Sequence, residues 1–385
     1  MKPPFTILYL CDTLHDELVY GAERSLTEIV HGLDRDRFVA HAIVRSGALK
    51  QALQEAGATV HFADLHPITI PGPRGVSRFA YRFLRFWQIV RSVKPAIMHA
   101  NDWHSNQCAA LGGLLARVPS VCHVRTISSR AYRQSWAFLS SAIIANSHSS
   151  AAPLRALVGR GQRLRVVYNG VDTERFRFDA SRRAATRTKL GLADSQLVIG
   201  VVGRLVPGKR QDLLLTALQQ ASRRVSDCVG LVVGDVVDPA SRAYVSDLQG
   251  IVERYGMGNQ VRFTGFIDDM VALYSAMDVL VSSSDAESFG RAVAEAMAAE
   301  RPVIATAVGG VREIVRHGKT GLLVPHGDSS AMADAIVALA NDPEKRRQMG
   351  EAGRERVAQR FSVDRCVRGV QGVYEELLSA WQDRT

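Results

Sequence analysis

The sequence lacks the features that mark several large classes of protein. Its five cysteines are far apart and no Cys-x-x-Cys pair occurs, so neither a disulfide framework nor a zinc knuckle is predicted. No apolar run approaches the roughly 18 residues of a membrane span, and the apolar start of the chain turns acidic too soon for a signal peptide. These absences favour a globular protein of a reducing compartment, which we expect to be cytoplasmic.

Two signatures of nucleotide and metal sites are also missing. The phosphate loop GxxxxGK[ST] does not occur. His99, Asp102 and His104 lie close together in the sequence, but no further well-spaced ligand accompanies them. We therefore predict neither a P-loop nor a metal site, and no cofactor.

Acidic residues are scarce in the first part of the chain. Residues 1–175 hold 21 Lys and Arg against 12 Asp and Glu, whereas residues 176–385 hold 27 against 26. A basic region of this kind predicts an anionic partner, which is a membrane surface, a phosphorylated acceptor or nucleic acid. No recognised nucleic-acid module accompanies it, so we do not expect nucleic acid.

Basic and aromatic residues alternate in residues 78–87. Arg78, Arg82 and Arg85 fall three to four positions apart, on one face of a predicted helix. Such a face suits anionic lipid, and predicts a peripheral position on the inner face of the membrane. The alternative is a helix whose aromatic side chains pack on a sheet while its arginines are solvated. The loop 125–133 adds three cations, which suit a phosphorylated or carboxylated acceptor.

Short apolar runs rich in β-branched residues recur along the chain, and helical patterns separate most of them. In the first part the expected strands are 6–10, 41–44, 59–62, 96–99, 120–123, 141–145 and 165–168. In the second part they are 197–202, 229–234, 261–265, 279–282, 303–306 and 321–324. This order predicts two doubly wound α/β domains with parallel sheets, at residues 1–175 and 176–362. We expect a ligand in the cleft between them.

The stretch 278–308 reads as strand, loop, helix and strand, and it carries two carboxylates. Glu287 lies in the loop and Glu295 lies one to two turns inside the helix, so about 10 Å separates them. This distance suits the two ends of an elongated ligand better than a shared proton or metal. The helix opens with Ser288, Phe289 and Gly290. Free amides and the helix dipole favour an anion at that point.

A second constellation follows the strand at 197–202. Gly203, Arg204 and Lys209 stand between that strand and the next predicted helix. Two cations there suit a clamp for a diphosphate, because doubly wound folds bind ligands at the carboxyl ends of their strands. The alternative is a solvated basic turn.

Three further candidates carry less information when taken alone. Gly21 and Ala22 start a helix after the first strand, where backbone amides can hold a phosphate, although a simple helix cap is the alternative. His123 ends an apolar strand and is expected to face the cleft, although a lone histidine is often structural. Asn169-Gly170 indicates a turn, where the chain leaves the first domain.

Taken together, these motifs resemble glycosyltransferase family 4. The resemblance rests on Glu287-x7-Glu295 within DAESFGRAVAEAMA, GRLVPGK at 203–209, NGVD at 169–172 and GAER at 21–24. Their order and spacing match along nearly the whole chain. The resemblance implies a GT-B fold, which has two Rossmann-like domains facing across a cleft and a final helix, here residues 363–385, that crosses back to the first domain. It also implies retaining transfer of a hexosyl-type unit from a nucleotide-diphosphate sugar without an essential metal.

The resemblance also assigns roles to residues of the second domain. The positions of Arg204 and Lys209, next to Gly203, hold the donor diphosphate. That of Glu295 binds the ribose hydroxyls, and that of Glu287 contacts the donor sugar. The amides around Ser288, Phe289 and Gly290 contribute to the same contact. Base contacts are largely made by backbone near Phe266.

In the first domain, the position of His123 lies beside the transferred sugar. The loop of Gly21 and Ala22 lies near the phosphate and the acceptor. A glycan, a glycolipid or a small molecule are all suitable acceptors, and cell-envelope glycan or glycolipid synthesis is the expected setting. Two alternatives to a transferase stay open at this point: a nucleotide-sugar epimerase of the same fold, and a non-catalytic module that binds sugar nucleotides.

Overall fold

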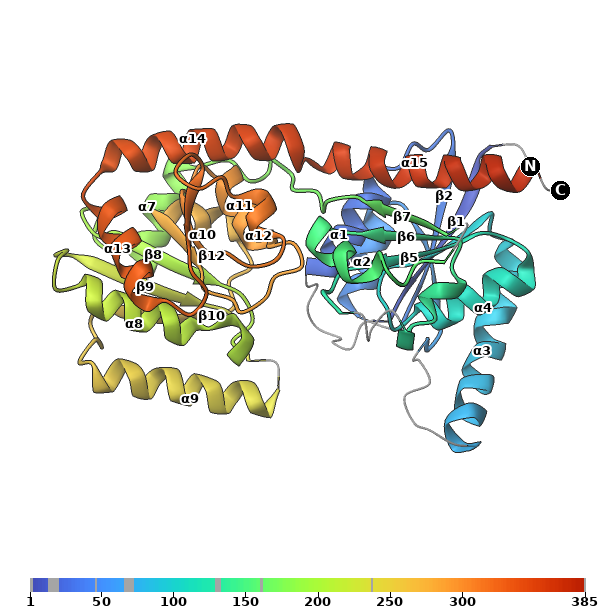
Figure 1. The fold of residues 1–385 in the computed structure, drawn as a ribbon, viewed down its shortest axis with the longest axis horizontal. Helices are drawn as coiled ribbons and strands as arrows, with labels where there is room; N and C mark the ends of the chain where they lie inside the picture. Colours follow the sequence, from blue (N-terminus) through green and yellow to red (C-terminus); the bar gives the residue numbers. More distant parts are fainter. Residues whose placement is uncertain are drawn as a thin grey trace. The chain divides into compact units, whose positions relative to one another are not determined.

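The computed structural model divides into two compact units, which are coloured along the chain in Figure 1. The residues that it describes are 3–12, 21–45, 47–65, 73–128, 133–159, 162–236 and 238–383. The first unit consists of Met1–Gly170 together with Val363–Thr385, and the second consists of Val171–Ser362. The division therefore falls inside the NGVD turn, whereas the boundary expected from the sequence was between residues 175 and 176.

In the described part of the first unit, seven parallel strands form one sheet in the order β3-β2-β1-β4-β5-β6-β7. The strands are β1 (Phe5–Cys11), β2 (Phe38–Val44), β3 (Thr59–Phe62), β4 (Ile97–Ala100), β5 (Ser120–Val124), β6 (Ala142–Ala145) and β7 (Arg163–Val166). The helices are α1 (Gly21–His31), α2 (Ala48–Glu55), α3 (Pro73–Val93), α4 (Asn106–Ala116), α6 (His148–Ala151) and α15 (Val363–Gln382), with short 3-10 turns η1 (Ala137–Leu139) and η2 (Ala152–Leu154).

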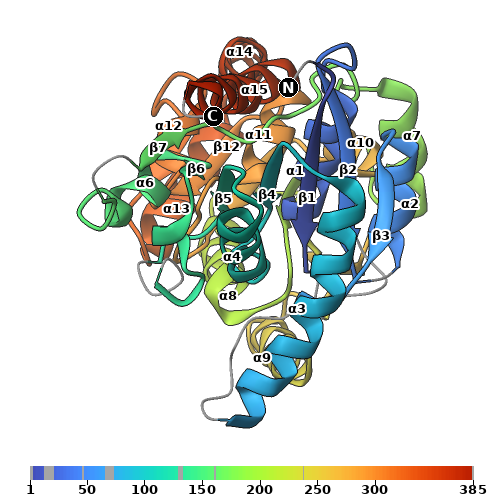
Figure 2. The same cartoon turned by 90° about the vertical axis from the view of Figure 1, so that its right-hand side faces the viewer.

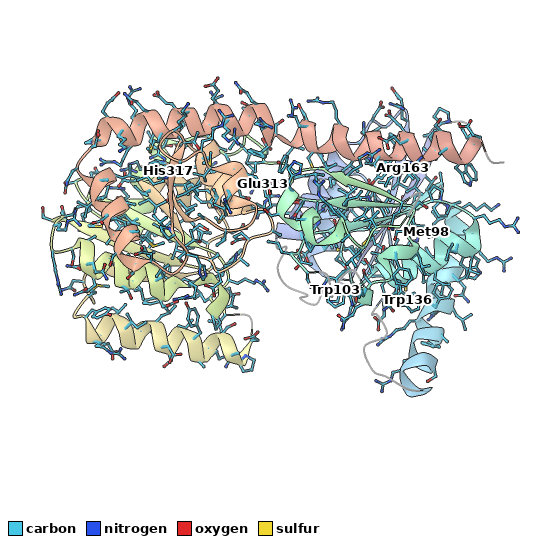
Figure 3. All side chains as sticks on the ribbon, in the orientation of Figure 1. Met98, Trp103, Trp136, Arg163, Glu313 and His317 are labelled. Atoms are coloured by element: carbon cyan, nitrogen blue, oxygen red, sulfur yellow. The ribbon has the colours of Figure 1, made fainter. Side chains whose placement is uncertain are left out.

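Strand β1 shows how helices cover both faces of this sheet. Its sequence FTILYLC is a continuous apolar run, as expected for a central parallel strand. Ile7 and Tyr9 pack with α1, α2 and α15, whereas Leu8 and Leu10 pack with α3 and α4. Met98 of β4, labelled in Figure 3, belongs to the second of these layers. Figure 2 shows the first turns of α3 extending beyond the sheet.

In the described part of the second unit, six parallel strands form a sheet in the order β10-β9-β8-β11-β12-β13. The strands are β8 (Leu197–Val202), β9 (Cys228–Val233), β10 (Val261–Gly265), β11 (Val279–Ser282), β12 (Val303–Thr306) and β13 (Gly321–Val324). The helices are α7 (Ala180–Lys189), η3 (Pro207–Lys209), α8 (Gln211–Ala221), α9 (Pro239–Arg254), α10 (Met270–Ala276), α11 (Arg291–Ala298), α12 (Val311–Ile314), α13 (Ser329–Ala340) and α14 (Pro343–Arg360). Two doubly wound α/β units with parallel sheets are thus confirmed.

Both sheets reverse their direction of winding once. The reversal lies between β1 and β4 in the first unit and between β8 and β11 in the second. Loops that leave the carboxyl ends of two strands at such a reversal run to opposite sides, and the crevice between them is where doubly wound folds bind ligands. The polar residues singled out in the sequence stand largely at these two places.

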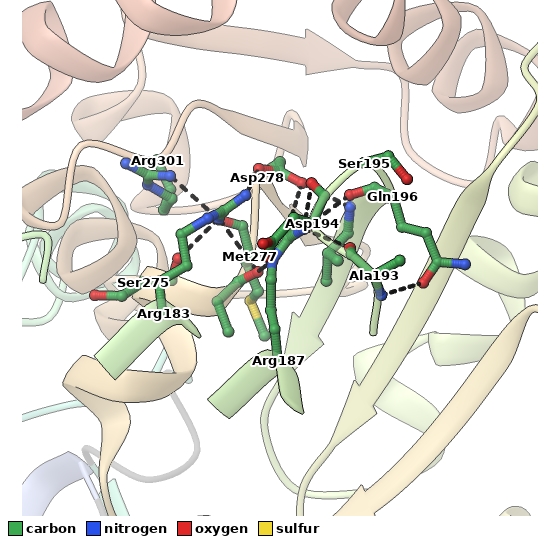
Figure 4. A network of polar contacts seen from close by, with 12 residues as sticks. Arg183, Arg187, Ala193, Asp194, Ser195, Gln196, Ser275, Met277, Asp278 and Arg301 are labelled. Atoms are coloured by element: carbon green, nitrogen blue, oxygen red, sulfur yellow. Dashed lines mark hydrogen bonds and ion pairs between the residues drawn. The ribbon is translucent and has the colours of Figure 1, made fainter. Parts of the chain in front are cut away.

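A largely buried carboxylate, 17% exposed, ties the second sheet to α7 (Figure 4). Asp278, just before β11, accepts hydrogen bonds from Arg183 at 2.8 Å, from Arg187 at 2.7 Å and from the amide of Val198 at 2.8 Å. Arg187 is only 1% exposed, and burial lowers its pKa while Asp278 opposes that shift. Its remaining donors reach the carbonyls of Ala193, Asp194, Gln196 and Ala276. Because every charge has a partner, the network tolerates its burial.

Helix α15 completes the core of the first unit. Cys366, Val370 and Leu377 pack in the same cluster as residues of α1 and β1. The Tyr374 hydroxyl lies 2.5 Å from Nδ1 of His99 on β4, and both residues are fully buried. Burial, with a smaller contribution from the charge of Arg125, lowers the pKa of His99 to about 3. His99 is therefore a neutral imidazole at neutral pH.

The Asp278 network predicts a large loss of stability when its carboxylate is removed. Asp278→Ala should lower the free energy of unfolding by about 3–5 kcal/mol, because Arg187 would remain buried without a counter-charge. Urea denaturation measures this loss. The matched control is Asp334→Ala, which breaks an exposed ion pair with Arg224 and should cost less than about 1 kcal/mol. Equal losses in the two variants would contradict the role given to the network.

His99 predicts a loss of stability in acid. Its pKa in the folded protein lies below its ordinary value of 6.5, so below pH 6.5 the unfolded chain takes up a proton that folded His99 does not bind. His99 alone should then cost about 2 kcal/mol between pH 6.5 and pH 5, since each pH unit corresponds to about 1.4 kcal/mol. Urea denaturation at several pH values should show a shallower pH dependence for His99→Gln, and an unchanged slope would refute the assignment.

Candidate functional site

Two loops of the second unit lie side by side at the winding reversal. Strands β8 and β11 are paired, with Val281 opposite Val201. The loop after β8 therefore meets the loop after β11. The amide of Asp285 donates to the carbonyl of Gly208 at 3.0 Å, and the Ser283 hydroxyl donates to the carbonyl of Lys209 at 2.9 Å. These bonds fix the GRLVPGK segment against the start of the segment that carries Glu287.

Glycines are required where the loops after β8 and β9 leave the sheet, because the two loops pass very close to each other there. Gly203 and Gly234 have φ angles of 154° and 158°, which side chains rarely adopt. A Cβ on Gly234 would lie 1.8 Å from the carbonyl oxygen of Gly203, so no side chain fits there. The side-chain amide of Gln211 donates to the carbonyl of Arg204 at 3.0 Å and holds the loop on α8.

Lys209 and Glu287 meet at this junction. The ammonium of Lys209 is hydrogen-bonded to Oε1 of Glu287, which also accepts from the Ser284 hydroxyl at 2.9 Å. The two charged side chains are 27% and 16% exposed, so the pair is accessible from solvent on one side. Arg204 is exposed on the same loop. The structure thus brings together one predicted cation and one predicted carboxylate, with the second cation close by in sequence.

Glu295 lies deeper than Glu287. It is 4% exposed, and each carboxylate oxygen accepts a hydrogen bond: Oε1 from Arg291 at 2.6 Å and Oε2 from Tyr274 at 3.0 Å. Arg291 precedes it by one helical turn on α11, and Tyr274 comes from α10. Both carboxylate oxygens of Glu295 are therefore held by neighbouring side chains, and its contact with a ribose remains a prediction.

The start of α11 is shaped by a pair of glycines that the sequence reasoning passed over. The amide of Gly310 donates to the carbonyl of Glu287 at 2.8 Å. A Cβ on Gly310 would lie 2.5 Å from the carbonyl oxygen of Ser288, so only glycine allows this close packing. Gly290, with φ of 101°, then begins the helix. The Gly-Gly pair at 309–310 is the sequence feature from which this close packing could have been predicted.

Two predicted donor residues differ in their surroundings. The ring of Phe289 is 2% exposed and packs against Phe361, at 5.8 Å between ring centroids, so its backbone is the part that can contribute to a site. Phe266 follows the edge strand β10, away from the β8–β11 reversal, and is 49% exposed. Its proposed place near a nucleotide base remains a prediction.

In the first unit, His123 on β5 is fully buried in a polar cluster. Its Nδ1 lies 3.4 Å from Nη2 of Arg125 and 3.3 Å from Nε2 of His99. Burial, then the charge of Arg125 and the neighbouring His99, lowers its pKa well below the ordinary value. Like His99, it is neutral at neutral pH. Its other ring nitrogen, Nε2, has no hydrogen-bond partner within the described residues.

Arg125, one of the three cations of the loop 125–133, is held by groups of its own unit. It donates to the carbonyl oxygen of Asn101 at 3.2 Å, to Oδ1 of the same residue at 2.8 Å and to Oδ1 of Asn169 at 2.6 Å. Asn101 in turn donates to the carbonyl of Ala22, in the first turn of α1 after Gly21, at 3.2 Å. Asn101 thus links Arg125 to the predicted Gly21 and Ala22 segment, and Asn169 holds Arg125; neither role was predicted from the sequence. Arg130, from the same basic loop, lies outside the described residues.

In the described ranges, no three His, Cys, Asp or Glu side chains form a group that could hold a metal ion. None of the helices in the described part of the chain combines the length and the apolarity that crossing a bilayer requires.

Curated relatives match part of the chain. A GDP-mannose-dependent alpha-(1-6)-phosphatidylinositol monomannoside mannosyltransferase of Mycobacterium tuberculosis is 36% identical over 204 residues, which are 51% of this chain and 51% of the relative. A D-inositol 3-phosphate glycosyltransferase of Streptomyces avermitilis is 34% identical over 249 residues, which are 63% of this chain and 53% of the relative. The chain spans about half the length of the curated relatives that it matches.

A solved structure and two families cover more of it. Anabaena HepE, crystallised in complex with UDP and glucose, has a TM-score of 0.85 and 28% identity over 97% of this chain and 100% of its own. Residues 19–175 match the family described as Glycosyltransferase Family 4, and residues 182–356 match Glycosyl transferases group 1. Together with the Glu287-x7-Glu295 motif and the two doubly wound units, these matches show that the chain belongs to glycosyltransferase family 4, with the GT-B fold.

Proposed function

We propose that this protein is a retaining glycosyltransferase, which moves a hexosyl unit from a nucleotide-diphosphate sugar to an acceptor hydroxyl without a metal ion. The observation that carries the proposal is the junction of Lys209 and Glu287 beside the start of α11. A cation, a carboxylate and a helix N-terminus stand there together, with Arg204 exposed on the same loop. This combination suits a ligand that joins a diphosphate to a polyhydroxylated sugar.

The chemistry needs positive charge where the leaving group forms. Breaking the bond to the sugar develops negative charge on the β-phosphate. Lys209, Arg204 and the amides that open α11 would stabilise that charge from fixed positions, which is the part that a metal ion plays in other sites. Glu287 would then accept hydrogen bonds from hydroxyls of the donor sugar.

Glu295 would bind the ribose at the other end of the donor. Its carboxylate is held by Arg291 and Tyr274, so it would meet the ribose hydroxyls from a fixed position. His123, in the first unit, would contact the transferred sugar, and the segment of Gly21 and Ala22 would lie near the acceptor and phosphate. Phe266 would border the base.

The names of similar proteins support particular classes of donor and acceptor for this proposal. The Anabaena neighbour binds UDP and UDP-glucose, and the mycobacterial relative is GDP-mannose-dependent. Two relatives are named for inositol-containing acceptors, phosphatidylinositol monomannoside and D-inositol 3-phosphate. We infer a nucleoside-diphosphate hexose as donor. A phosphorylated acceptor would also suit the basic first part of this chain, as would a role in cell-envelope glycan or glycolipid synthesis in the cytoplasm.

Turnover of nucleotide sugars tests this function. Wild-type protein incubated with UDP-glucose or GDP-mannose and a panel of phosphoinositol acceptors should release the nucleoside diphosphate only when an acceptor is present, and NMR of the product should show a retained anomeric configuration. Lys209→Met should lower kcat by about 10²–10³-fold, because a group that stabilises developing charge is lost. Lys319→Met, a change at an exposed lysine outside the junction, is the control.

Other results would replace the proposal. Interconversion of the free sugar nucleotides, with no dependence on an acceptor, would indicate an epimerase. Tight donor binding with no turnover for any donor and acceptor pair would indicate a non-catalytic binding module. Equal turnover by Lys209→Met and the wild type would remove the diphosphate role of the junction.

We further propose that α3 rests on an anionic membrane surface. A groove of about 980 Å³ runs between α3 and the end of β3, and its cationic lining residues are Arg45, Arg78, Arg82 and Arg85. Asp64 pairs with Arg82 at 2.8 Å. Tyr81 and Leu84 of the same helix are 66% and 61% exposed, while Phe86 is buried against the sheet. Apolar and cationic groups thus share the outer surface of a helix that extends beyond the sheet (Figures 1 and 2).

Vesicle sedimentation tests this surface. Wild-type protein should bind vesicles that contain anionic phospholipid and not neutral ones, and binding should weaken with salt. Arg78→Gln combined with Arg85→Gln should weaken binding roughly thirtyfold, since each cation near such a surface contributes about 1 kcal/mol. Arg91→Gln combined with Arg155→Gln removes the same charge from exposed positions outside the groove. Equal weakening by both pairs would attribute binding to net charge alone.

A further inference from the structure

Within the described residues, one ring nitrogen of the buried polar cluster lacks a hydrogen-bond partner. Nε2 of His123 is buried, and within the described residues no group accepts from it or donates to it. A buried polar atom of this kind normally has a partner, because leaving it unpaired costs stability. Whether Nε2 carries the proton decides which ligand atoms it can contact. The groups that contact the other ring nitrogen, Nδ1, determine which of the two nitrogens carries the proton.

Arg125 places a donor on the opposite nitrogen. A guanidinium donates hydrogen bonds and cannot accept them. Its Nη2 lies 3.4 Å from Nδ1 of His123 and is oriented by Asn101, whose Oδ1 accepts from the same nitrogen at 2.8 Å. Nδ1 of His123 is therefore the acceptor nitrogen of the ring.

A second path reaches the same nitrogen from α15. His99 Nε2 lies 3.3 Å from Nδ1 of His123, so it must carry a proton if the latter is an acceptor. His99 Nδ1 is then unprotonated, and it faces the Tyr374 hydroxyl at 2.5 Å. The hydroxyls of Tyr374 and Tyr9 are hydrogen-bonded at 3.1 Å, and either phenol can donate in this pair. When the Tyr374 proton is directed to His99, Tyr9 is the donor to Tyr374.

The charge states of these groups agree with one proton on each ring. Burial lowers the pKa of His99 to about 3, and that of His123 lies well below its ordinary value. Burial raises the pKa of Tyr374, so its hydroxyl keeps its proton. These charge states put one proton on each imidazole, and the donor contact of Arg125 with Nδ1 of His123 then places the His123 proton on Nε2.

We propose that His123 presents a protonated Nε2 as a hydrogen-bond donor, and that Tyr374, acting through His99, is a positioning residue that maintains this tautomer. The atom that Nε2–H contacts must then be an acceptor, such as a hydroxyl or phosphate oxygen, and His123 does not serve as a base through Nε2. That this oxygen belongs to the donor sugar rests on the proposed function, whereas the tautomer does not.

Nitrogen NMR of the protein labelled with 15N only at histidine tests the proton positions directly. His123 and His99 are assigned from the signals lost in His123→Gln and His99→Gln. Both rings should show a protonated Nε2 and an unprotonated Nδ1 at neutral pH. A His123 ring protonated at Nδ1 would overturn the proposal, whatever the activity of the protein.

Tyr374→Phe tests the part played by α15. The ring that packs on Phe38 is kept, so the variant should fold, and only the hydroxyl is lost. His99 should then show a mixture of tautomers, the protonated fraction of His123 Nε2 should fall, and kcat/KM should fall about tenfold. Tyr9→Phe is the matched control, because it removes an equally buried hydroxyl that hydrogen-bonds neither imidazole. Unchanged histidine spectra in Tyr374→Phe, or equal changes in both variants, would refute the positioning role.

Discussion

The pairing of β8 with β11 is the constraint on which the candidate site depends. Parallel strands in register end at one edge, so the loops that follow them have to emerge together. Lys209 and Glu287 are 78 positions apart in the chain, yet they share a hydrogen bond because their strands are neighbours. The pairing of β1 with β4 does the same for Asn101 in the first unit, which reaches both α1 and Arg125 from that edge.

Much of this arrangement could be predicted from the sequence. Apolar runs of parallel strands are easy to recognise, and cations, carboxylates and glycines single out the loops after β8 and β11, whose ligand role stays a prediction. The partners of those residues were not predicted. Arg125 was noted only as a cation suited to an acceptor, because nothing local indicates Asn101 and Asn169 as its hydrogen-bond acceptors. The Arg291–Glu295 bond, by contrast, follows helical spacing and could have been found.

Charged side chains with little access to solvent are held by several hydrogen bonds at three places in this protein. Asp278 and Arg125 each make more than one hydrogen bond to groups from other elements, and Glu295 is bonded by Arg291 of its own helix and by Tyr274 of α10. Such groups cost stability when a partner is missing, but they also fix the direction of each donor and acceptor. At Asp278 these bonds hold α7 and β8 against the start of β11. At Glu295 they hold the carboxylate in a fixed direction between α10 and α11.

The position of α15 at the end of the chain affects the order in which the two units can fold during synthesis. Residues 363–382 leave the ribosome only after the whole of the second unit, yet their apolar side chains fill the core against α1 and β1. During synthesis, the first unit therefore waits with an uncovered apolar surface while a complete second domain is translated and can fold. The buried histidine His99 meets Tyr374 only at the end of that interval. Translation speed and chaperone protection across residues 171–362 should therefore govern how much of the first unit matures correctly.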